Sequence, residues 1–431
     1  MIKRETRFNE QQSLFLRKRV LLICLLFAGF IGLQGVIAKQ SKSPVKKGTG
    51  NQKVSRKPDQ NRKPHSPPNK SEIIGGIEIG SSGVKAIAFQ ILYDSSGDGF
   101  EVTKIYDPQT KDTSIMPPGA DGKFKKSALD DTVAVTKEFY GEMRARQIPD
   151  SKIYIAGSSG LRASNKKELE NLVKGATGKD MLFLNAKDEV RNTIEGAIPA
   201  WVMDKGRPRN NWLMSVLIDI GSGNTKGGYL EKRLSEKIIY DDYIFEVPRA
   251  SKTYADEIGK KMTGGNMNLE TFSQKARSLT ADSILSPLRD ELTRKPGLLH
   301  RERVYLSGGI IYVMVTLLHP TDRRAYVPIT IEDIKKFRRL VVEDQEKLLN
   351  PEVNWSAVKG QREREEIERD LIRVKGIFND KQLIAGAEIL DALSKELKFE
   401  KRRVRFMRHA LYAWIMSHTA YQAFGEKKSS R

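Results

Sequence analysis

The sequence is poor in the residues that build disulfides and zinc sites. Cys24 is the only cysteine among 431 residues, so no internal disulfide can form. Only five histidines occur, and those of the main body show no spacing typical of metal ligands: His300, His319, His409 and His418. We therefore expect these histidines to be ordinary surface or core residues.

Acidic residues are scarce at the N-terminus, and this shortage explains most of the charge. Residues 1–19 carry a net charge of +4 and residues 39–71 carry +9, out of +21 for the whole chain. The body after Ser71 is therefore only mildly basic. A basic pI that comes from one arm is weak support for nucleic-acid binding, so we expect no specific nucleic-acid partner.

An apolar segment follows the first basic cluster. In "VLLICLLFAGFIGLQGVIA" (residues 20–38), Gln34 is the only polar side chain. The segment suits a cleaved signal peptide, and it is also just long enough to span a bilayer as a signal anchor. Six basic residues precede it and seven follow in residues 39–58, so the positive-inside rule leaves the side of the body open. We expect a cell-envelope location, with the body exported or anchored in the membrane.

Residues 39–71 lack apolar periodicity and are rich in Pro, Lys, Arg, Asn and Ser. This composition predicts a disordered, extended linker. Its basic side chains could hold it against an anionic membrane surface, although a merely solvated spacer is an equal alternative.

Strand patterns alternate with helix patterns from residue 72 onward. "IIGGIEIGSSGVKAIAFQIL" predicts a hairpin, and "IYIAGSSGLRASNKKELENLVKGAT" predicts a strand, a glycine turn and a helix. A second hairpin, "VLIDIGSGNTKGGYL", lies about 140 residues after the first. The order predicts a duplicated α/β fold, with one domain over residues 72–200 and another over residues 212–425 that includes the C-terminal helices.

The two hairpins share a constellation of acid, glycine, serine and lysine. Glu78 corresponds to Asp219 and Lys85 corresponds to Lys226, with a glycine turn between acid and lysine in each. Glycine lets backbone N–H groups converge on phosphate oxygens, and carboxylates can hold Mg²⁺. The predicted phosphate-binding residues are Gly80, Ser81, Ser82, Gly83, Lys85, Gly221, Ser222, Gly223, Asn224, Thr225 and Lys226, together with Gly308 and Gly309 of "LSGG".

These motifs resemble the exopolyphosphatase and guanosine pentaphosphate phosphohydrolase family of the actin-like ATPase superfamily. "EIGSSG" and "DIGSGNTK" are similar to the family's two phosphate loops, and "IAGSSGLRASN", "KDEVRNTIEG" and the closing helix–strand–helix follow in the family's order. The resemblance implies a two-domain, RNase H-like α/β fold with an interdomain cleft. It also implies a phosphoanhydride hydrolase that acts on polyphosphate or a nucleotide polyphosphate, and it allows a homodimer.

The resemblance also implies residue roles. Glu189 would activate the attacking water, Arg162 would clamp the terminal phosphoryl group, and Glu78 and Asp219 would bind Mg²⁺. Each role has an ordinary structural alternative: a helix-start carboxylate for Glu189, a surface salt bridge for Arg162, a strand-end carboxylate for Asp219. Lys85 and Lys226 could simply be solvated strand residues.

Two departures from the family pattern suggest a different function. Glu78 stands in place of an aspartate, and Lys226 stands where the family has a glutamate. A cation there should attract phosphate but oppose a metal or a water-activating carboxylate. The sequence therefore also allows a weak or inactive, membrane-tethered sensor of polyphosphate or nucleotides. A sugar-kinase-like ATPase is a third alternative, disfavoured because only "LSGG" suggests an adenosine site.

Overall fold

A computed structural model of the chain describes residues 71–429, except positions 94–99, 107, 114, 116–120, 205–206, 234–238 and 263–267. The predicted signal segment and nearly all of the predicted linker lie outside the described residues. Within the described part of the chain, no helix is both long enough and apolar enough to cross a membrane.

The first of two large sheets is built around a hairpin, as the sequence predicts. Strands β1 (Ser71–Ile79) and β2 (Gly83–Tyr93) pair antiparallel, and β5 (Ile153–Gly157) lies parallel to β1 on its other side. The strand order is β3-β2-β1-β5-β6, with β4 also paired to β2; the remaining bounds are β3 (Phe100–Ile105), β4 (Gln109–Asp112) and β6 (Met181–Phe183).

The second sheet repeats this arrangement. Strands β9 (Ser215–Ile220) and β10 (Thr225–Arg233) form the matching hairpin, and β12 (Arg303–Ser307) lies parallel to β9. The order is β11-β10-β9-β12-β14-β13, with β11 (Ile239–Val247), β13 (Tyr326–Pro328) and β14 (Arg403–Met407). Because strand order and direction agree over five strands, the predicted duplication is confirmed.

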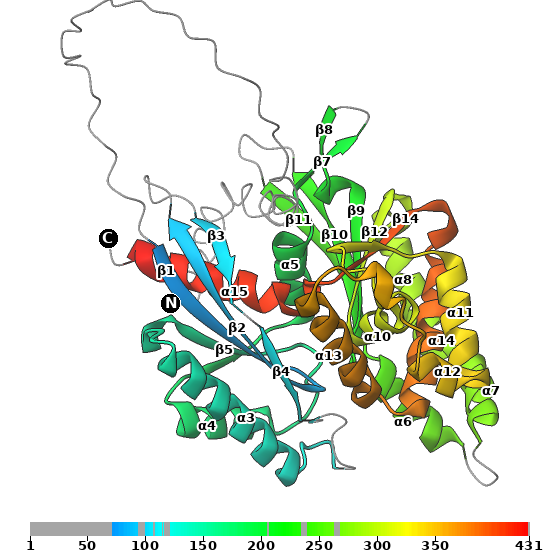
Figure 1. Ribbon diagram of the computed structural model, residues 1–431, viewed down its shortest axis with the longest axis horizontal. Coiled ribbons are helices and arrows are strands. Elements are labelled where there is room, and N and C mark those ends of the chain that lie inside the picture. Colours follow the sequence, from blue (N-terminus) through cyan, green and yellow to red (C-terminus); the bar gives the residue numbers. More distant parts are fainter. Residues whose placement is uncertain are drawn as a thin grey trace, which may run out of the picture.

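Helices cover both faces of each sheet (Figure 1). Helices α3 (Lys126–Ala145) and α4 (Lys166–Thr177) bury one face of the first sheet. Helix α5 (Ala186–Ala197) packs on the second sheet, where Val190 and Ile194 contact a cluster that includes Leu217 and Leu230. The opposite face of the second sheet lies in the largest apolar core of the protein.

That largest core gathers the helices between β11 and β14. Helices α10 (Gly309–Leu318) and α14 (Asp380–Glu396) contribute its most buried stretches, and burial on all sides explains why α10 is a nearly continuous apolar run. The helices of this region are α6 (Ser251–Lys261), α7 (Leu269–Thr280), α8 (Ser286–Arg294), α9 (Gly297–His300), α10 (Gly309–Leu318), α11 (Ile331–Glu343), α12 (Gln345–Leu349), α13 (Gln361–Ile377) and α14 (Asp380–Glu396). A short hairpin, β7 (Trp201–Asp204) and β8 (Arg207–Asn210), joins the two halves of the chain.

The last helix, α15 (Ala410–Ser429), differs from the expectation that the C-terminal helices belong to the second domain. Trp414 and Ile415 of α15 share an apolar cluster with Ile74 and Phe89 of the first sheet. The helix also lies along α5, and Figure 1 shows it crossing between the two sheets. The chain end therefore returns to the first domain and buries the face of β1 that α3 does not cover.

Candidate active site in the interdomain cleft

The acid and the lysine of each hairpin face one another across the two strands. Glu78 lies opposite Lys85 in the β1–β2 register, and Asp219 lies opposite Lys226 in the β9–β10 register. The Lys85 ammonium donates to Glu78 Oε1 at 2.7 Å, and the Lys226 ammonium lies 3.4 Å from Asp219 Oδ2. Both turns close with the same type of backbone hydrogen bond, Gly80 N–H to Gly83 O and Gly221 N–H to Asn224 O. Each acid thus has a cation from its own hairpin.

Glu189 enters this arrangement from the start of α5. The side chain of Asn185 caps the helix by accepting a hydrogen bond from the Asp188 N–H, which places Glu189 in the first turn. Lys226 Nζ donates to Glu189 Oε1 at 2.5 Å, and the Ser159 N–H donates to Glu189 Oε2 at 2.8 Å. Both carboxylate oxygens of the predicted water-activating residue are therefore engaged by protein groups.

The pKa values of Glu189 and of two neighbouring charged residues, Lys226 and Glu78, are shifted from their ordinary values. Burial alone would lower the pKa of Lys226, but Glu189 and Asp219 more than reverse this effect and raise it. Burial would raise the pKa of Glu189, and the Lys226 ammonium with the Ser159 hydrogen bonds lowers it instead. Glu78 is different, because burial raises its pKa despite the opposing effect of Lys85. Lys226 and Glu189 therefore form a stably charged buried pair.

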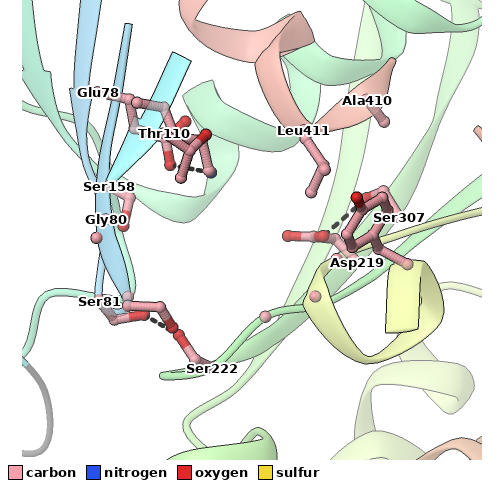
Figure 2. A pocket seen from close by; sticks show the side chains of 18 of the residues that line it. Glu78, Gly80, Ser81, Thr110, Ser158, Asp219, Ser222, Ser307, Ala410 and Leu411 are labelled. Carbon is pink, nitrogen blue, oxygen red and sulfur yellow. Dashed lines mark hydrogen bonds and ion pairs between the residues drawn. The ribbon is translucent and has the colours of Figure 1, made fainter. Parts of the chain in front are cut away.

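A cavity of about 130 Å³ lies between the two hairpins, the α10 start and the C-terminal helix (Figure 2). Most of the predicted site residues line it. They are Glu78, Gly80, Ser81, Ser82, Gly83, Lys85, Glu189, Asp219, Gly221, Ser222, Asn224, Lys226, Gly308 and Gly309. The structure thus brings together side chains that are more than 200 residues apart in the sequence.

Three predicted residues do not line the cavity. The Arg162 side chain is 42% exposed and forms an ion pair with Glu246 of β11, which matches the surface salt bridge named as its alternative. Gly223 packs against the backbone of Gly160, and Thr225 is buried within β10. The Oγ1 of Thr225 has no hydrogen-bond partner among the described residues.

The two glycine turns touch one another. The Ser81 and Ser222 hydroxyls share a hydrogen bond across the domain boundary, and Figure 2 shows these two side chains pointing toward each other. Asn224 Nδ2 donates to Ser159 Oγ at 3.1 Å and also to Glu246 at 2.5 Å. The phosphate loops predicted for opposite domains therefore meet at one end of the cavity.

Several lining residues were not singled out in the sequence. Ser307 belongs to "LSGG" and donates to Asp219 Oδ1 at 2.7 Å, so the motif itself could have identified it. Arg373 of α13 brings a guanidinium to the cavity from a densely charged helix that carries no local signal. The others are Thr110, Asp112, Ser158, Gly160, Thr193, Tyr312, Ile377, Phe378, Ala410, Leu411 and Trp414. The apolar members of this set come from the end of α13, the residue that follows it, and α15.

The side chains present do not fit the predicted Mg²⁺ site. Glu78 and Asp219 are each paired with a lysine, and the described residues contain no group of three acidic, histidine or cysteine side chains that could hold a metal. Glu78 Oε2 is a buried oxygen without a hydrogen-bond partner in the described chain, but Lys85 lies on the other oxygen of the same carboxylate, and its positive charge opposes a metal ion there. In this arrangement ammonium groups stand beside the acids that were expected to bind metal.

No model of a known protein family matches the sequence, and no curated protein matches it. Solved structures do share its fold. An exopolyphosphatase-like protein is 14% identical, with a TM-score of 0.55, over 81% of this chain and 97% of its own. An exopolyphosphatase from Cytophaga hutchinsonii is 12% identical, with a TM-score of 0.54, over 82% of this chain and 98% of its own. The fold is therefore the two-domain, actin-like fold of exopolyphosphatase-like proteins, as the sequence resemblance implied.

Proposed function

We propose that this protein binds a compound with phosphoanhydride bonds in the interdomain cleft and hydrolyses it. The ligand would be inorganic polyphosphate or a guanosine polyphosphate. The observation that carries the proposal is that Glu189 lies in the same cavity as both glycine turns and "LSGG". The fold shared with exopolyphosphatase-like proteins supports this class of reaction.

The residues of the cleft supply binding groups for such a ligand. Backbone N–H groups of the two turns can donate to phosphoryl oxygens, and the α10 N-terminus beginning at Gly309 favours negative charge. Glu189, held ionised by Lys226, is the candidate base for the attacking water. Each oxygen of Glu189 accepts one hydrogen bond in the structure, which leaves further acceptor sites on the carboxylate for a water molecule.

A second candidate function is binding without turnover. The contact between Lys226 and Glu189 favours it, because a carboxylate whose pKa is lowered by a bound ammonium is a weak base. In this case the protein would sense polyphosphate or a nucleotide. Figure 2 shows that the neighbouring acid in the cavity, Asp219, is hydrogen-bonded to Ser307.

Phosphate release by the full-length protein tests the first candidate against the second. The substrates are inorganic polyphosphate of several chain lengths and guanosine tetra- and pentaphosphate, each supplied with and without Mg²⁺. We expect Glu189→Gln to lower the rate by roughly 10²–10⁴-fold. Glu168→Gln, on the exposed start of α4, is the control and should leave the rate unchanged.

Each result of this experiment assigns the function. Saturable binding of the same compounds without phosphate release would favour the sensor. A protein that neither binds nor cleaves any of them would overturn both candidates.

We also propose that residues 20–38 hold the body at the cell envelope. The basis is the sequence pattern alone, namely an apolar segment between two basic clusters. The location bears on the ligand, because an exported body would meet inorganic polyphosphate more readily than guanosine polyphosphates. Fractionation of cells that express the full chain, with and without residues 1–38, tests this proposal.

A further inference from the structure

The Lys226 ammonium lies between two carboxylates that come from different elements of the fold. It is 2.5 Å from Glu189 Oε1, on helix α5, and 3.4 Å from Asp219 Oδ2, on strand β9. Ser159 Oγ, from the loop after β5, lies 3.3 Å from the same nitrogen. Three oxygens of two domains thus converge on one cation.

This position is enclosed by protein. The Lys226 side chain is 5% exposed and the Glu189 side chain 4% exposed. The β9–β10 register places Lys226 directly opposite Asp219, so the short antiparallel ladder fixes where the side chain begins. A buried ammonium group with close partners is held far more firmly than that of a surface lysine. If it moved away, buried carboxylates would be left without a counter-charge.

Two facing carboxylates such as Glu189 and Asp219 could also bind a divalent cation between them. Mg²⁺ takes six oxygens at about 2.0–2.1 Å and tolerates little distortion. An ammonium 2.5 Å from one of these oxygens leaves no room for a metal ion in contact with it. The added positive charge would also repel a second cation at close range.

The first hairpin repeats the pattern in a more exposed form. Lys85 donates to Glu78 across the β1–β2 ladder, and its side chain is 22% exposed. The same type of acid–ammonium pair therefore occupies both positions where the sequence predicts a metal-binding acid. Because both hairpins carry such a pair, the pairing of acid with ammonium is a feature of the whole cleft and not of one substituted position.

We propose that Lys226 takes the place of a divalent cation between Glu189 and Asp219, so that the cleft takes up no metal of its own and binds phosphate chains without Mg²⁺. The ligand half of this inference rests on the proposed function, whereas the metal half does not. Lys226 is a positioning residue here, since it holds the carboxylates of Glu189 and Asp219 on either side of its ammonium group.

Titration of the full-length protein with Mn²⁺ alone, followed by the electron paramagnetic resonance of free Mn²⁺, tests the metal half. Wild-type protein should show no saturable site. Lys226→Glu should gain a site at least tenfold tighter, because three carboxylates would then converge without a counter-cation. Lys226→Arg should exclude Mn²⁺ as the wild type does. Lys232→Gln, at an exposed position of the same strand, is the matched control.

A second variant keeps the test decisive if Lys226→Glu does not fold. If circular dichroism shows that Lys226→Glu is unfolded, Lys226→Met replaces it, since it keeps the aliphatic stem and loses the charge. A saturable Mn²⁺ site in the wild type would overturn the inference. So would a folded Lys226→Glu, or a folded Lys226→Met in its place, that binds Mn²⁺ no better than the wild type.

Calorimetry with inorganic triphosphate tests the ligand half. We expect the wild-type dissociation constant to change by less than threefold between EDTA and Mg²⁺, and that of the metal-binding variant to fall at least tenfold when Mg²⁺ is added. A tenfold Mg²⁺ dependence in the wild type contradicts the inference. Absence of triphosphate binding under every condition contradicts the ligand half and the proposed function, while the Mn²⁺ titration still decides the role of Lys226.

Discussion

Gly223 in the second glycine turn packs directly against Gly160 of the opposite domain. A Cβ atom added at Gly223 would lie 2.5 Å from the carbonyl oxygen of Gly160, a distance that real Cβ atoms essentially never show. The neighbouring Ser81–Ser222 hydrogen bond crosses the same boundary. At this end of the cleft the two domains are therefore in backbone contact, and only glycine fits.

Substitution Gly223→Ala should push the two glycine turns apart. Because the obstacle is backbone and not a flexible side chain, relief requires a shift of a whole loop. We expect a loss of about 1–3 kcal/mol in the free energy of unfolding, comparable with overpacking in a core. We also expect weaker binding of triphosphate.

Urea unfolding measures the first effect and calorimetry the second. Gly175→Ala is the control, since a Cβ there meets no atom within 4 Å and the residue lies inside helix α4, where alanine is favoured. Equal stability of Gly223→Ala and the wild type would show that the turns separate freely.

Arg162 offers a test of the role implied by the family resemblance. In the structure it forms an ion pair with Glu246 and does not line the cavity. If it only makes this partly exposed ion pair, Arg162→Ala should cost at most about 1 kcal/mol of stability and leave triphosphate affinity unchanged. We expect this result from the described arrangement.

The control for Arg162 is another partly exposed arginine pair far from the cleft. Arg289 donates to Glu396 through two nitrogens, and Arg289→Ala should cost a similar amount of stability. A tenfold loss of triphosphate affinity in Arg162→Ala alone would instead mean that Arg162 leaves Glu246 and clamps the ligand.

The parts of the site that depend on local pattern could be predicted from the sequence. The alternation around "EIGSSG" and "DIGSGNTK" correctly predicted two hairpins with Glu78 and Asp219 near the strand ends. In each hairpin the acid and the lysine are seven residues apart. This spacing implies that the two side chains pair across the strands, because a turn of four residues places them opposite one another.

The parts that depend on long-range packing could not be predicted. Lys226 and Glu189 are 37 residues apart, on a strand and a helix respectively, so no local pattern reveals their contact. The return of α15 to the first sheet is also invisible in its own sequence, because an apolar helix face does not specify which apolar surface it covers. The alternative that Lys226 is a solvated strand residue is wrong, because the residue is only 4% exposed.

Arg373 is the cationic residue of the cavity that the sequence did not reveal. It lies on α13, and its guanidinium is 5.7 Å from the centre of the Tyr312 ring. Burial alone would lower its pKa, but Tyr412, Tyr312 and Asp112 raise it, so the charge is retained inside the cleft. We expect Arg373→Met to weaken triphosphate binding about tenfold, as loss of a charge-assisted hydrogen bond would.

A neighbouring arginine on the same helix provides the control for this prediction. Arg369 is exposed, and Arg369→Met should leave triphosphate affinity unchanged while it alters the net charge by the same amount. Equal losses in both variants would indicate a general effect of net charge. No loss in either would place the ligand away from α13.

His418 should make the protein less stable in mild acid. The side chain is 8% exposed on α15, and burial lowers its pKa from 6.5 to about 4. The unfolded chain therefore takes up a proton as the pH falls below 6.5, whereas the folded chain does so only near pH 4. This linkage costs about 2 kcal/mol of stability between pH 7.5 and pH 5, and the loss is complete below pH 4.

Urea unfolding of the wild type and of His418→Gln at pH 7.5 and pH 5 checks the prediction. The variant should be the less stable protein at pH 7.5, because glutamine does not fill the buried position of the imidazole ring, but its stability should fall less on acidification. His300→Gln, at the end of α9, is the control for loss of an exposed histidine and should keep the wild-type pH dependence. If His418→Gln loses as much stability as the wild type between the two pH values, the acid sensitivity comes from other groups.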